Sequence, residues 1–321
     1  MINKKIIWAL ITFFALVLFS CEEVDDNDPI AKIDDVKKVK LADFDGDGND
    51  DVFTTTSSGW FVSYGGVTSF TKINTSTAQV DEILIGDLDG DGIADVFYPA
   101  INGFQGSGWY VSHGGITPWT KINALTAQVG EVYLADMNND GKDDVFYPTL
   151  NGTQGTGWYV SYGGTTSWSM IFYSAAQLRE IKLGDFNGDG ELDVFYPALT
   201  GYLGAGWYIS YSGTSIWEKF NSLTAQVFEV LIGDFDGNGM DDVFYLCNNG
   251  TLNTGWYISY GGSSSWNKVN DSSDTLSKVL IGDLNGDGKD DVFTAKPDGL
   301  YVSYGGKSNW TKINDQIEIF E

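Results

Sequence analysis

A short aspartate-rich motif recurs along this chain with the spacing of a cation-binding loop. Each copy reads Asp-x-(Asp/Asn)-x-(Asp/Asn)-Gly-x-x-Asp-Val-Phe, and the six copies begin at Asp43, Asp87, Asp136, Asp185, Asp234 and Asp283. Side-chain oxygens at positions 1, 3, 5 and 9, with the backbone carbonyl of position 7, can converge on one hard cation. Calcium takes roughly six to eight oxygen ligands in flexible geometry, whereas magnesium demands a tighter octahedron. The motif therefore predicts up to six Ca²⁺ sites.

The predicted ligands stand at the five odd positions of each loop. They are Asp43, Asp45, Asp47, Asn49 and Asp51; Asp87, Asp89, Asp91, Ile93 and Asp95; Asp136, Asn138, Asp140, Lys142 and Asp144; Asp185, Asn187, Asp189, Glu191 and Asp193; Asp234, Asp236, Asn238, Met240 and Asp242; and Asp283, Asn285, Asp287, Lys289 and Asp291. Position 6 is always glycine, which permits the sharp turn. A polar turn without metal is the alternative for any single copy, although its clustered carboxylates would then repel one another.

The acidic loops belong to a longer repeat that predicts an all-β fold. Successive loops start 44 and then 49 residues apart, and each is followed by Gly-Trp-(Tyr/Phe)-(Val/Ile)-Ser-(Tyr/His), with leucine replacing tryptophan in the sixth copy. In the second copy the pattern predicts strands at 82–86, 95–99, 109–113 and 119–123, separated by glycine-rich turns. Six such units predict a six-bladed β-propeller of four-stranded blades. A seven-bladed ring is the alternative, but the ends supply too few residues for a seventh unit.

The loop residues resemble those of the FG-GAP/VCBS repeat family, known from integrin heads and many bacterial surface proteins. The resemblance covers nearly all of the chain after residue 35, and it implies a β-propeller with calcium between the first two strands of each blade. The segment Trp158–Gly164, repeated in the other copies, also resembles the Psathyrella velutina lectin type. Proteins of that type have seven blades and bind sugars between them, which implies a carbohydrate ligand, although this chain shows six units.

Four of the six units carry a longer connection between their second and third strands. Asp87 and Trp109 of the second unit lie 22 residues apart, a spacing shared by the third to fifth units, whereas Asp43 and Trp60 of the first unit lie 17 apart. The sixth unit is short again. Because connections alternate between the two ends of a blade, we expect the longer ones on the face opposite the acidic loops.

The longer connections contain the side chains that we expect to bind a ligand. They are Tyr98, Asn102, Gln105 and Trp109; Tyr147, Asn151, Gln154 and Trp158; Tyr196 and Trp207; and Tyr245, Asn249 and Trp256. Aromatic rings beside amides suit sugars, which stack their apolar faces and hydrogen-bond through hydroxyls. Two alternatives stay open, in which the tryptophans are inter-blade core and the amides only form turns. A second tryptophan set is expected to pack: Trp119, Trp168, Trp217, Trp266 and Trp310.

Composition argues against several function classes. The formal net charge of −26 would repel phosphate backbones, so nucleic acid is not an expected partner. The single histidine, His113, stands where the other copies have tyrosine, and the single arginine is Arg179. No catalytic constellation is evident, so we predict that the protein is not an enzyme and keep a polysaccharide-active enzyme as a lesser alternative. Cys247 is expected to be a buried free thiol.

The first twenty residues resemble a secretory signal. Lys4 and Lys5 precede an apolar run at 6–19 that is too short to span a bilayer. The following Leu-Phe-Ser-Cys resembles the lipobox of bacterial lipoproteins, which implies lipidation of Cys21; an ordinary cleaved signal is the alternative. Residues 21–35 are acidic and predict a solvated tether, which leaves 36–321 as the propeller. We therefore expect an extracytoplasmic monomer, lipid-anchored to the bacterial outer membrane and exposed at the surface.

Together these patterns predict a non-enzymatic, calcium-binding β-propeller whose partner is a glycan, bound on the face with the longer connections. A protein–protein adhesion module of the integrin type is the alternative, with a surface protein as the partner.

Overall fold

The computed structural model of the chain describes residues 38–103, 106–199, 203–248 and 252–316, apart from the side chains of residues 101–103. The predicted signal segment, Cys21 and the tether lie outside the described residues, as do Gln105 and Asn249. Residues 32–321 form one compact unit, which contains all the strands. Among the described residues no helix is long and apolar enough to cross a membrane.

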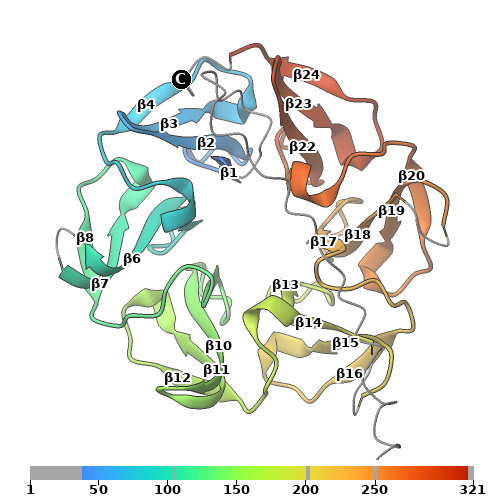
Figure 1. The fold of residues 1–321 in the computed structure, drawn as a ribbon, viewed down its shortest axis with the longest axis horizontal. Helices are drawn as coiled ribbons and strands as arrows, with labels where there is room; N and C mark the ends of the chain where they lie inside the picture. The colour runs from blue at the N-terminus through green and yellow to red at the C-terminus, as the bar shows by residue number, and fades with distance from the viewer. Residues whose placement is uncertain (1–37, 104–105, 200–202, 249–251, 317–321) are drawn as a thin grey trace, which may run out of the picture. The chain divides into compact units, whose positions relative to one another are not determined.

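The described residues form six antiparallel sheets, each made of four consecutive strands (Figure 1). This arrangement confirms the predicted all-β, six-bladed propeller of four-stranded blades. The strands are β1 (Val39–Ala42), β2 (Asp51–Thr56), β3 (Gly59–Ser63) and β4 (Thr71–Asn74); β5 (Leu84–Gly86), β6 (Asp95–Gly103), β7 (Gly106–Ser112) and β8 (Thr120–Asn123); β9 (Tyr133–Ala135), β10 (Asp144–Gly152), β11 (Gly155–Ser161) and β12 (Ser169–Phe172); β13 (Lys182–Gly184), β14 (Asp193–Ala198), β15 (Gly206–Ser210) and β16 (Glu218–Asn221); β17 (Val230–Gly233), β18 (Asp242–Cys247), β19 (Gly255–Ser259) and β20 (Asn267–Asn270); and β21 (Leu280–Gly282), β22 (Asp291–Lys296), β23 (Gly299–Ser303) and β24 (Thr311–Asn314).

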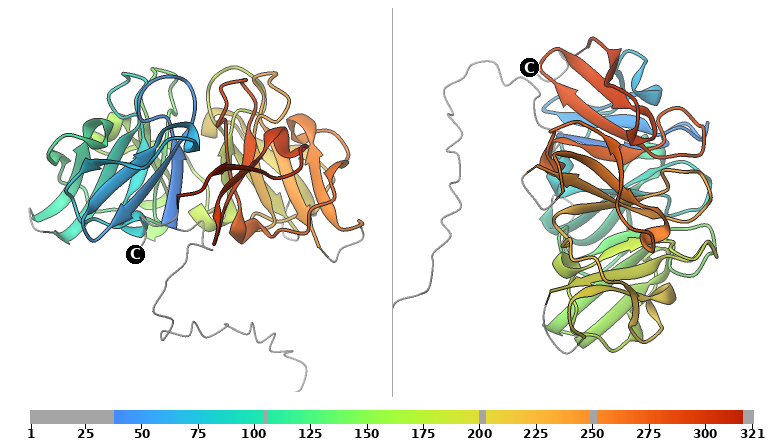
Figure 2. Two further views of the ribbon diagram at one scale, coloured as in Figure 1. Left: turned by 90° about the horizontal axis from the view of Figure 1, so that it is seen from above. Right: turned by 90° about the vertical axis from the view of Figure 1, so that its right-hand side faces the viewer.

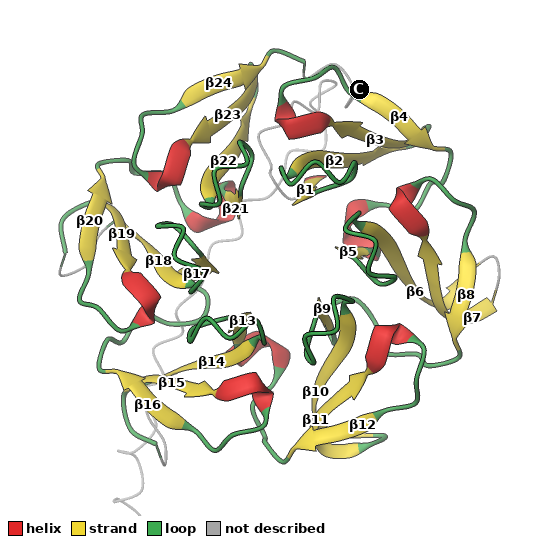
Figure 3. Ribbon diagram, turned by 180° about the vertical axis from the view of Figure 1, so that it is seen from behind, coloured by secondary structure: helices red, strands yellow, loops and turns green. Residues whose placement is uncertain are grey.

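Single-turn 3₁₀ helices punctuate the described blades. One follows each third strand, and Figure 3 shows these helices in red around one face: η2 (Tyr64–Gly66), η4 (His113–Gly115), η5 (Tyr162–Gly164), η7 (Tyr211–Gly213), η8 (Tyr260–Gly262) and η10 (Tyr304–Gly306). Three more precede first strands: η3 (Val80–Glu82), η6 (Leu178–Glu180) and η9 (Leu276–Lys278). The acidic loops join first to second strands, so they lie at the same end of each blade as the helices after the third strands.

The ring closes by contacts between the first and sixth blades. The backbone N–H of Asp50 donates to the carbonyl oxygen of Asp283 at 2.6 Å. At the outer strand, the side-chain amide of Asn314 donates to the carbonyl oxygens of Gly66 at 3.2 Å and Thr68 at 2.8 Å. Each blade uses its own four strands, seen side-on in Figure 2. Closure therefore needs no strand shared between the two ends of the chain.

The core between blades is aromatic. The third-strand tryptophans are fully buried in blades one to five, and their indole N–H groups donate to an alanine carbonyl oxygen in the four cases Trp60, Trp109, Trp158 and Trp207. Trp207 lies edge-on to Phe195 of its own blade, with ring centroids 5.3 Å apart, and edge-on to Trp266 of the next blade at 5.3 Å. Such a pair joins two blades, and edge-to-face packing adds to the burial of both rings.

A glycine–aspartate pairing fits neighbouring blades together beside the acidic loops. The first strand of blade two ends in Gly86, and a Cβ there would overlap the carboxylate of Asp143 in blade three. That carboxylate accepts the N–H of Asp87 at 2.9 Å. Gly184, Gly233 and Gly282 face Asp241, Asp290 and Asp50 in the same way.

The remaining two junctions carry alanine in place of this glycine and no aspartate opposite it. At the junction of blades one and two, Ala42 takes the place of the glycine and Ala94 the place of the aspartate. At the junction of blades three and four, these places are taken by Ala135 and Leu192. Glycine therefore occurs at each junction where an aspartate needs its space, and at neither of the two where the aspartate is missing.

We predict that Gly86→Ala destabilises the protein by about 1–3 kcal/mol, because the added methyl group overpacks against Asp143. In the Asp143→Ala background the same substitution should cost much less, since alanine pairs with alanine at the natural Ala42–Ala94 junction. A double-mutant cycle of urea unfolding measures this coupling. Equal costs in the two backgrounds would contradict the pairing.

We also predict that Trp207→Ala lowers the free energy of unfolding by about 3–5 kcal/mol, because it opens a cavity at a blade junction. Ile216→Ala is the matched surface control, since the Ile216 side chain is 82% exposed. Its cost should stay within about 0.5 kcal/mol. Chemical denaturation of both variants measures the difference, and similar costs would show that Trp207 does not hold the junction together.

Candidate functional site

Each acidic loop ends in a buried aspartate, which in blades one to five accepts hydrogen bonds from two turns. In blade one, Asp51 is fully buried. Its carboxylate accepts the N–H of Phe44 in the loop at 2.8 Å and the N–H of Gly65 in η2 at 2.7 Å. The equivalent residues Asp95, Asp144, Asp193, Asp242 and Asp291 are buried in the same way. Position 9 of the motif thus joins the loop to the turn after the third strand.

The first aspartate of each loop organises the loop backbone. In blade one the carboxylate of Asp43 accepts the N–H of Gly46 at 2.6 Å and the N–H of Gly48 at 2.8 Å. Both glycines have positive φ, at 76° and 86°. In blade three the first of these positions is Asn139, which has φ 55° and takes the left-handed conformation that asparagine tolerates. The backbone therefore wraps around the first carboxylate.

Carboxylate oxygens converge in three of the described loops, as a cation site requires. Three-member groups with ligand atoms within 4.8 Å of one another are Asp43, Asp45 and Asp51; Asp87, Asp89 and Asp91; and Asp234, Asp236 and Asp242. In the third group Asp236 Oδ1 is buried and accepts no hydrogen bond from the described residues. A buried carboxylate oxygen without a donor is costly, and a cation would satisfy it. The residues present therefore fit a calcium ion.

Burial keeps the position-9 carboxylates difficult to ionise in the absence of a cation. The pKa of Asp51 is raised to about 7, mainly by burial, with the nearby Asp45 and Asp43 carboxylates contributing to that rise. Burial likewise raises the pKa of Asp144 to about 6. At the blade junctions, burial raises the pKa of Asp290 to about 8. A bound divalent cation would supply the positive charge that these groups lack.

The four third-strand tryptophans that we predicted as ligand contacts are core residues. Trp109, Trp158, Trp207 and Trp256 are all 0% exposed. No ring face is available to a ligand, so the prediction that they bind one directly is wrong, and the inter-blade alternative holds. The sequence signal for this burial was Trp60, which persists in a blade with a short connection.

The predicted amide ligands lie in or beside the hairpins formed by the second and third strands. Asn151 is exposed and has φ 58°; it lies near the end of β10, within the register shift between Thr149 and Gly152, and the β10–β11 ladder continues to the Gly152–Gly155 pair. Gln154 is exposed, and its carbonyl oxygen accepts the hydroxyl of Tyr159 at 2.6 Å. Asn102 belongs to β6, but its side chain is not described. Much of the longer connection in blades two and three is thus extended hairpin.

The four predicted tyrosines lie in a repeated arrangement that includes partners the prediction missed. Each is half-buried and faces a half-buried tryptophan of the second set, with ring centroids 5.1–5.5 Å apart: Tyr98 with Trp119, Tyr147 with Trp168, Tyr196 with Trp217, and Tyr245 with Trp266. A glutamate precedes the first strand of each of these blades: Glu82, Glu131, Glu180 and Glu229. Burial raises the pKa of Tyr98 and of Tyr196. The negative charge of Glu82 raises the pKa of Tyr98 as well, and that of Glu180 does the same for Tyr196.

Blade one replaces every member of this arrangement, with Phe70 in place of the tryptophan, and blade six keeps only the tryptophan, Trp310. Thr54 and Thr294 stand in place of the tyrosine, and Lys38 and Lys278 in place of the glutamate. The hydroxyl of Thr54 donates to the carbonyl oxygen of Lys38 at 2.9 Å. The glutamate, the tyrosine and the longer connection are therefore present together or absent together. The part of this signal that the prediction missed was the glutamate, which is replaced by lysine in the same two blades.

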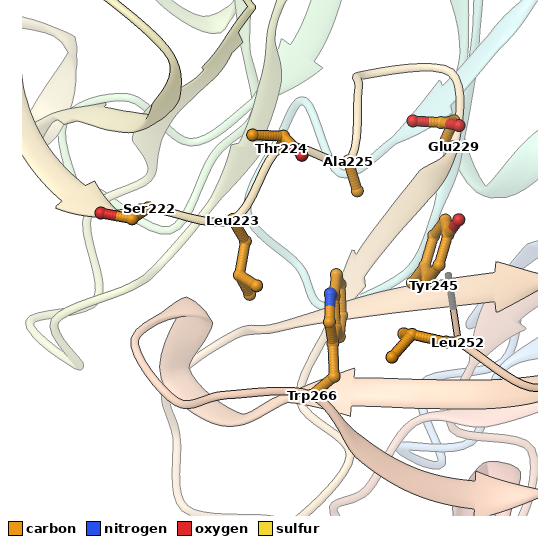
Figure 4. Close-up of a pocket in the computed structure, with 8 residues that line it drawn as sticks. All are labelled: Ser222, Leu223, Thr224, Ala225, Glu229, Tyr245, Leu252 and Trp266. Atoms are coloured by element: carbon orange, nitrogen blue, oxygen red, sulfur yellow. The ribbon is translucent and has the colours of Figure 1, made fainter. Parts of the chain in front are cut away.

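A pocket of about 550 Å³ lies at the junction of blades four and five (Figure 4). It is lined by Ser222, Leu223, Thr224 and Ala225 between β16 and β17, Glu229, Tyr245 of β18, Leu252 of the longer connection, and Trp266. The rings of Tyr245 and Trp266 are 5.1 Å apart and 28° from parallel, and Figure 4 shows the tyrosine hydroxyl on the side of Glu229. Burial raises the pKa of Tyr245 to about 12, with Cys247 and Glu229 contributing. The pocket thus offers an aromatic wall beside a carboxylate.

We predict that calcium stabilises the protein and that its effect grows with pH. The buried carboxyls have folded-state pKa values of about 6–8, above about 3.9 in the unfolded chain. Between these values the folded protein holds protons that the unfolded chain has lost, so the free energy of unfolding falls as pH rises. Calcium would replace the protons on the position-9 carboxyls, such as Asp51 and Asp144. Differential scanning calorimetry from pH 4 to 8, with calcium or with a chelator, should give midpoints that diverge as pH rises. Chelation without effect at any pH would contradict this.

Comparison with known proteins identifies the repeat. The FG-GAP-like repeat matches residues 136–196 and 234–294, each spanning from one acidic loop to the second strand of the next blade. No curated protein matches the chain in sequence.

Among solved structures, an Agrocybe aegerita lectin, described for its specific recognition of non-reducing terminal N-acetylglucosamine, is 19% identical with a TM-score of 0.54, covering 87% of this chain and 80% of the lectin. An ancestral GH74 enzyme (15% identity, TM-score 0.44) covers 86% of this chain and 40% of the enzyme. An exotype rhamnogalacturonan lyase is 15% identical in sequence with a TM-score of 0.36, and the match covers 73% of this chain and 49% of the lyase. The chain carries FG-GAP-like repeats on a six-bladed β-propeller of four-stranded blades.

Proposed function

We propose that this chain is a non-enzymatic, calcium-binding β-propeller that binds carbohydrate at the junctions preceding blades two to five. The observation that carries the proposal is the covariation at those junctions. Glutamate, tyrosine and a longer connection occur together in four blades, and lysine, threonine and a short connection replace them in two. Packing needs alone do not explain this, since the two variant blades fold into the same four-stranded sheet.

The junction chemistry suits a sugar ring. The stacked tyrosine and tryptophan are half-buried, so they present an apolar surface to the C–H face of a sugar. An ionised glutamate accepts hydrogen bonds from hydroxyl groups. The pocket of about 550 Å³ lies within the range of small-molecule sites. The similar fold of a lectin that recognises N-acetylglucosamine also supports a carbohydrate ligand.

The junction pocket supports binding better than catalysis. Glycoside hydrolysis uses two carboxyl groups across the scissile bond. The residues lining the pocket between blades four and five include one carboxylate, Glu229. A glutamate acting alone can hold hydroxyl groups but lacks the second group of such a pair.

In this proposal the acidic loops have a structural role at the opposite end of each blade. Calcium bound there holds the turns at each blade end, and the junctions at the other end stay rigid for the ligand. We further propose that the protein is an extracytoplasmic monomer, lipidated at Cys21 and anchored to the bacterial outer membrane.

A glycan-array screen of residues 22–321 in millimolar calcium, with a chelated control, tests the proposal. These residues contain the whole compact unit. We predict binding to a defined glycan that disappears on chelation. Folded, calcium-loaded protein that binds no glycan would contradict the proposal and favour the protein-adhesion alternative.

Replacing Tyr98, Tyr147, Tyr196 and Tyr245 together by threonine, the residue that blades one and six carry, should weaken glycan binding about tenfold or more at each site through loss of the stacked ring. The unfolding midpoint should be nearly retained, because Thr54 and Thr294 fit the same place. Tyr162→Phe, in η5 on the opposite face, is the matched control and should bind normally. Undiminished binding by the quadruple variant would place the site elsewhere.

A further inference from the structure

The single histidine of the chain points into one acidic loop. His113 opens η4 of blade two, where the other blades carry tyrosine: Tyr64, Tyr162, Tyr211, Tyr260 and Tyr304. Its Nδ1 lies 3.0 Å from Asp89 Oδ2 and 3.1 Å from Asp95 Oδ2. These two aspartates stand at positions 3 and 9 of the blade-two loop. Two elements, the loop and the turn after β7, therefore bring one nitrogen and two oxygens together.

The three side chains form a sheltered but accessible set. Asp95 is 1% exposed at its side chain, whereas His113 and Asp89 are 36% and 38% exposed. The carboxylate of Asp95 is fixed by the N–H groups of Gly114 at 2.8 Å and Leu88 at 3.1 Å. The ligand atoms of all three lie within 4.8 Å of one another. One ligand is thus rigid and buried, while the other two open toward solvent.

We propose that the blade-two loop binds a transition-metal ion of the zinc type through His113 Nδ1, Asp89 and Asp95. Imidazole nitrogen favours zinc and its neighbours in the periodic table, whereas calcium prefers an all-oxygen shell. Zinc lies about 2.0–2.2 Å from nitrogen and carboxylate ligands, which places ligand atoms of a tetrahedral site a little over 3 Å apart. The observed separations of 3.0 and 3.1 Å are close to this.

Zinc competes with calcium for this loop. Asp89 also belongs to the all-carboxylate group with Asp87 and Asp91, so zinc takes the place that calcium takes in the other loops. Three protein ligands leave a fourth position for water, as in zinc sites that are open to solvent.

Isothermal titration calorimetry of zinc into tag-free residues 22–321, saturated with millimolar calcium, tests the proposal. The expected result is one tight zinc site per chain and, with cobalt as a spectroscopic probe, visible absorption typical of tetrahedral coordination. His113→Tyr installs the residue of the other five blades, so its fold should persist in the calcium-loaded protein. It should bind zinc at this site at least tenfold more weakly and lose the cobalt band.

A transplant distinguishes a true ligand from a general effect of the imidazole. Blade one has aspartates at the same loop positions, Asp45 and Asp51, near Tyr64. Tyr64→His in the His113→Tyr background should restore zinc binding and the cobalt band. Equal zinc binding by the wild-type protein and His113→Tyr, no zinc binding by either, or failure of the transplant in a folded variant would each overturn the proposal. Cys247 is retained throughout, so it cannot account for a difference between variants.

Discussion

The buried aspartate at position 9 of each loop is the constraint on which the rest of the structure depends. In five blades, as at Asp51, this carboxylate accepts N–H groups from the acidic loop on one side and from the turn after the third strand on the other, and in the sixth Asp291 accepts the N–H of Gly305 in that turn. A buried carboxylate is costly unless donors and positive charge compensate it. Backbone N–H groups supply the donors here, and the converging loop carboxylates create the need for a cation. The same group thus fixes the end of every blade and, under the proposed calcium binding, would couple folding to the metal.

The two faces of the ring differ because the connections between strands alternate between the two ends of each blade. At one end, acidic loops and the glycine–aspartate pairs fit neighbouring blades together, as Gly86 does with Asp143. At the other, a tyrosine and a tryptophan form each junction in four blades and leave space beside a glutamate, as at Tyr245 and Trp266. In the repeated unit, the residues at the acidic-loop end are nearly the same in all six blades, whereas those at the other end differ. Blades one and six show this difference, with Thr54 and Thr294 in place of the tyrosine.

The fold was predictable because six copies of one pattern report the same strands and turns, whereas a single copy would not. The sites were less predictable. Trp109 and its equivalents matched a sugar platform by residue type, but their burial depends on the neighbouring blade, which is distant in sequence. Glu229 and Trp266 were missed because each approaches Tyr245 only after folding. His113 was rightly recognised as a replacement for tyrosine, but its distances to Asp89 and Asp95 depend on how η4 meets the loop.

A crystal structure of the protein grown in calcium, with anomalous difference maps recorded at long wavelength, tests the central claim most directly. The account predicts an ion in the acidic loops, held by the carboxylates of positions 1, 3 and 5 and the carbonyl of position 7, with the position-9 aspartate completing the shell. Asp236 Oδ1, which is buried without a donor, should lie against one of these ions. Loops that contain only water, in a protein that remains folded and equally stable in chelator, would contradict it.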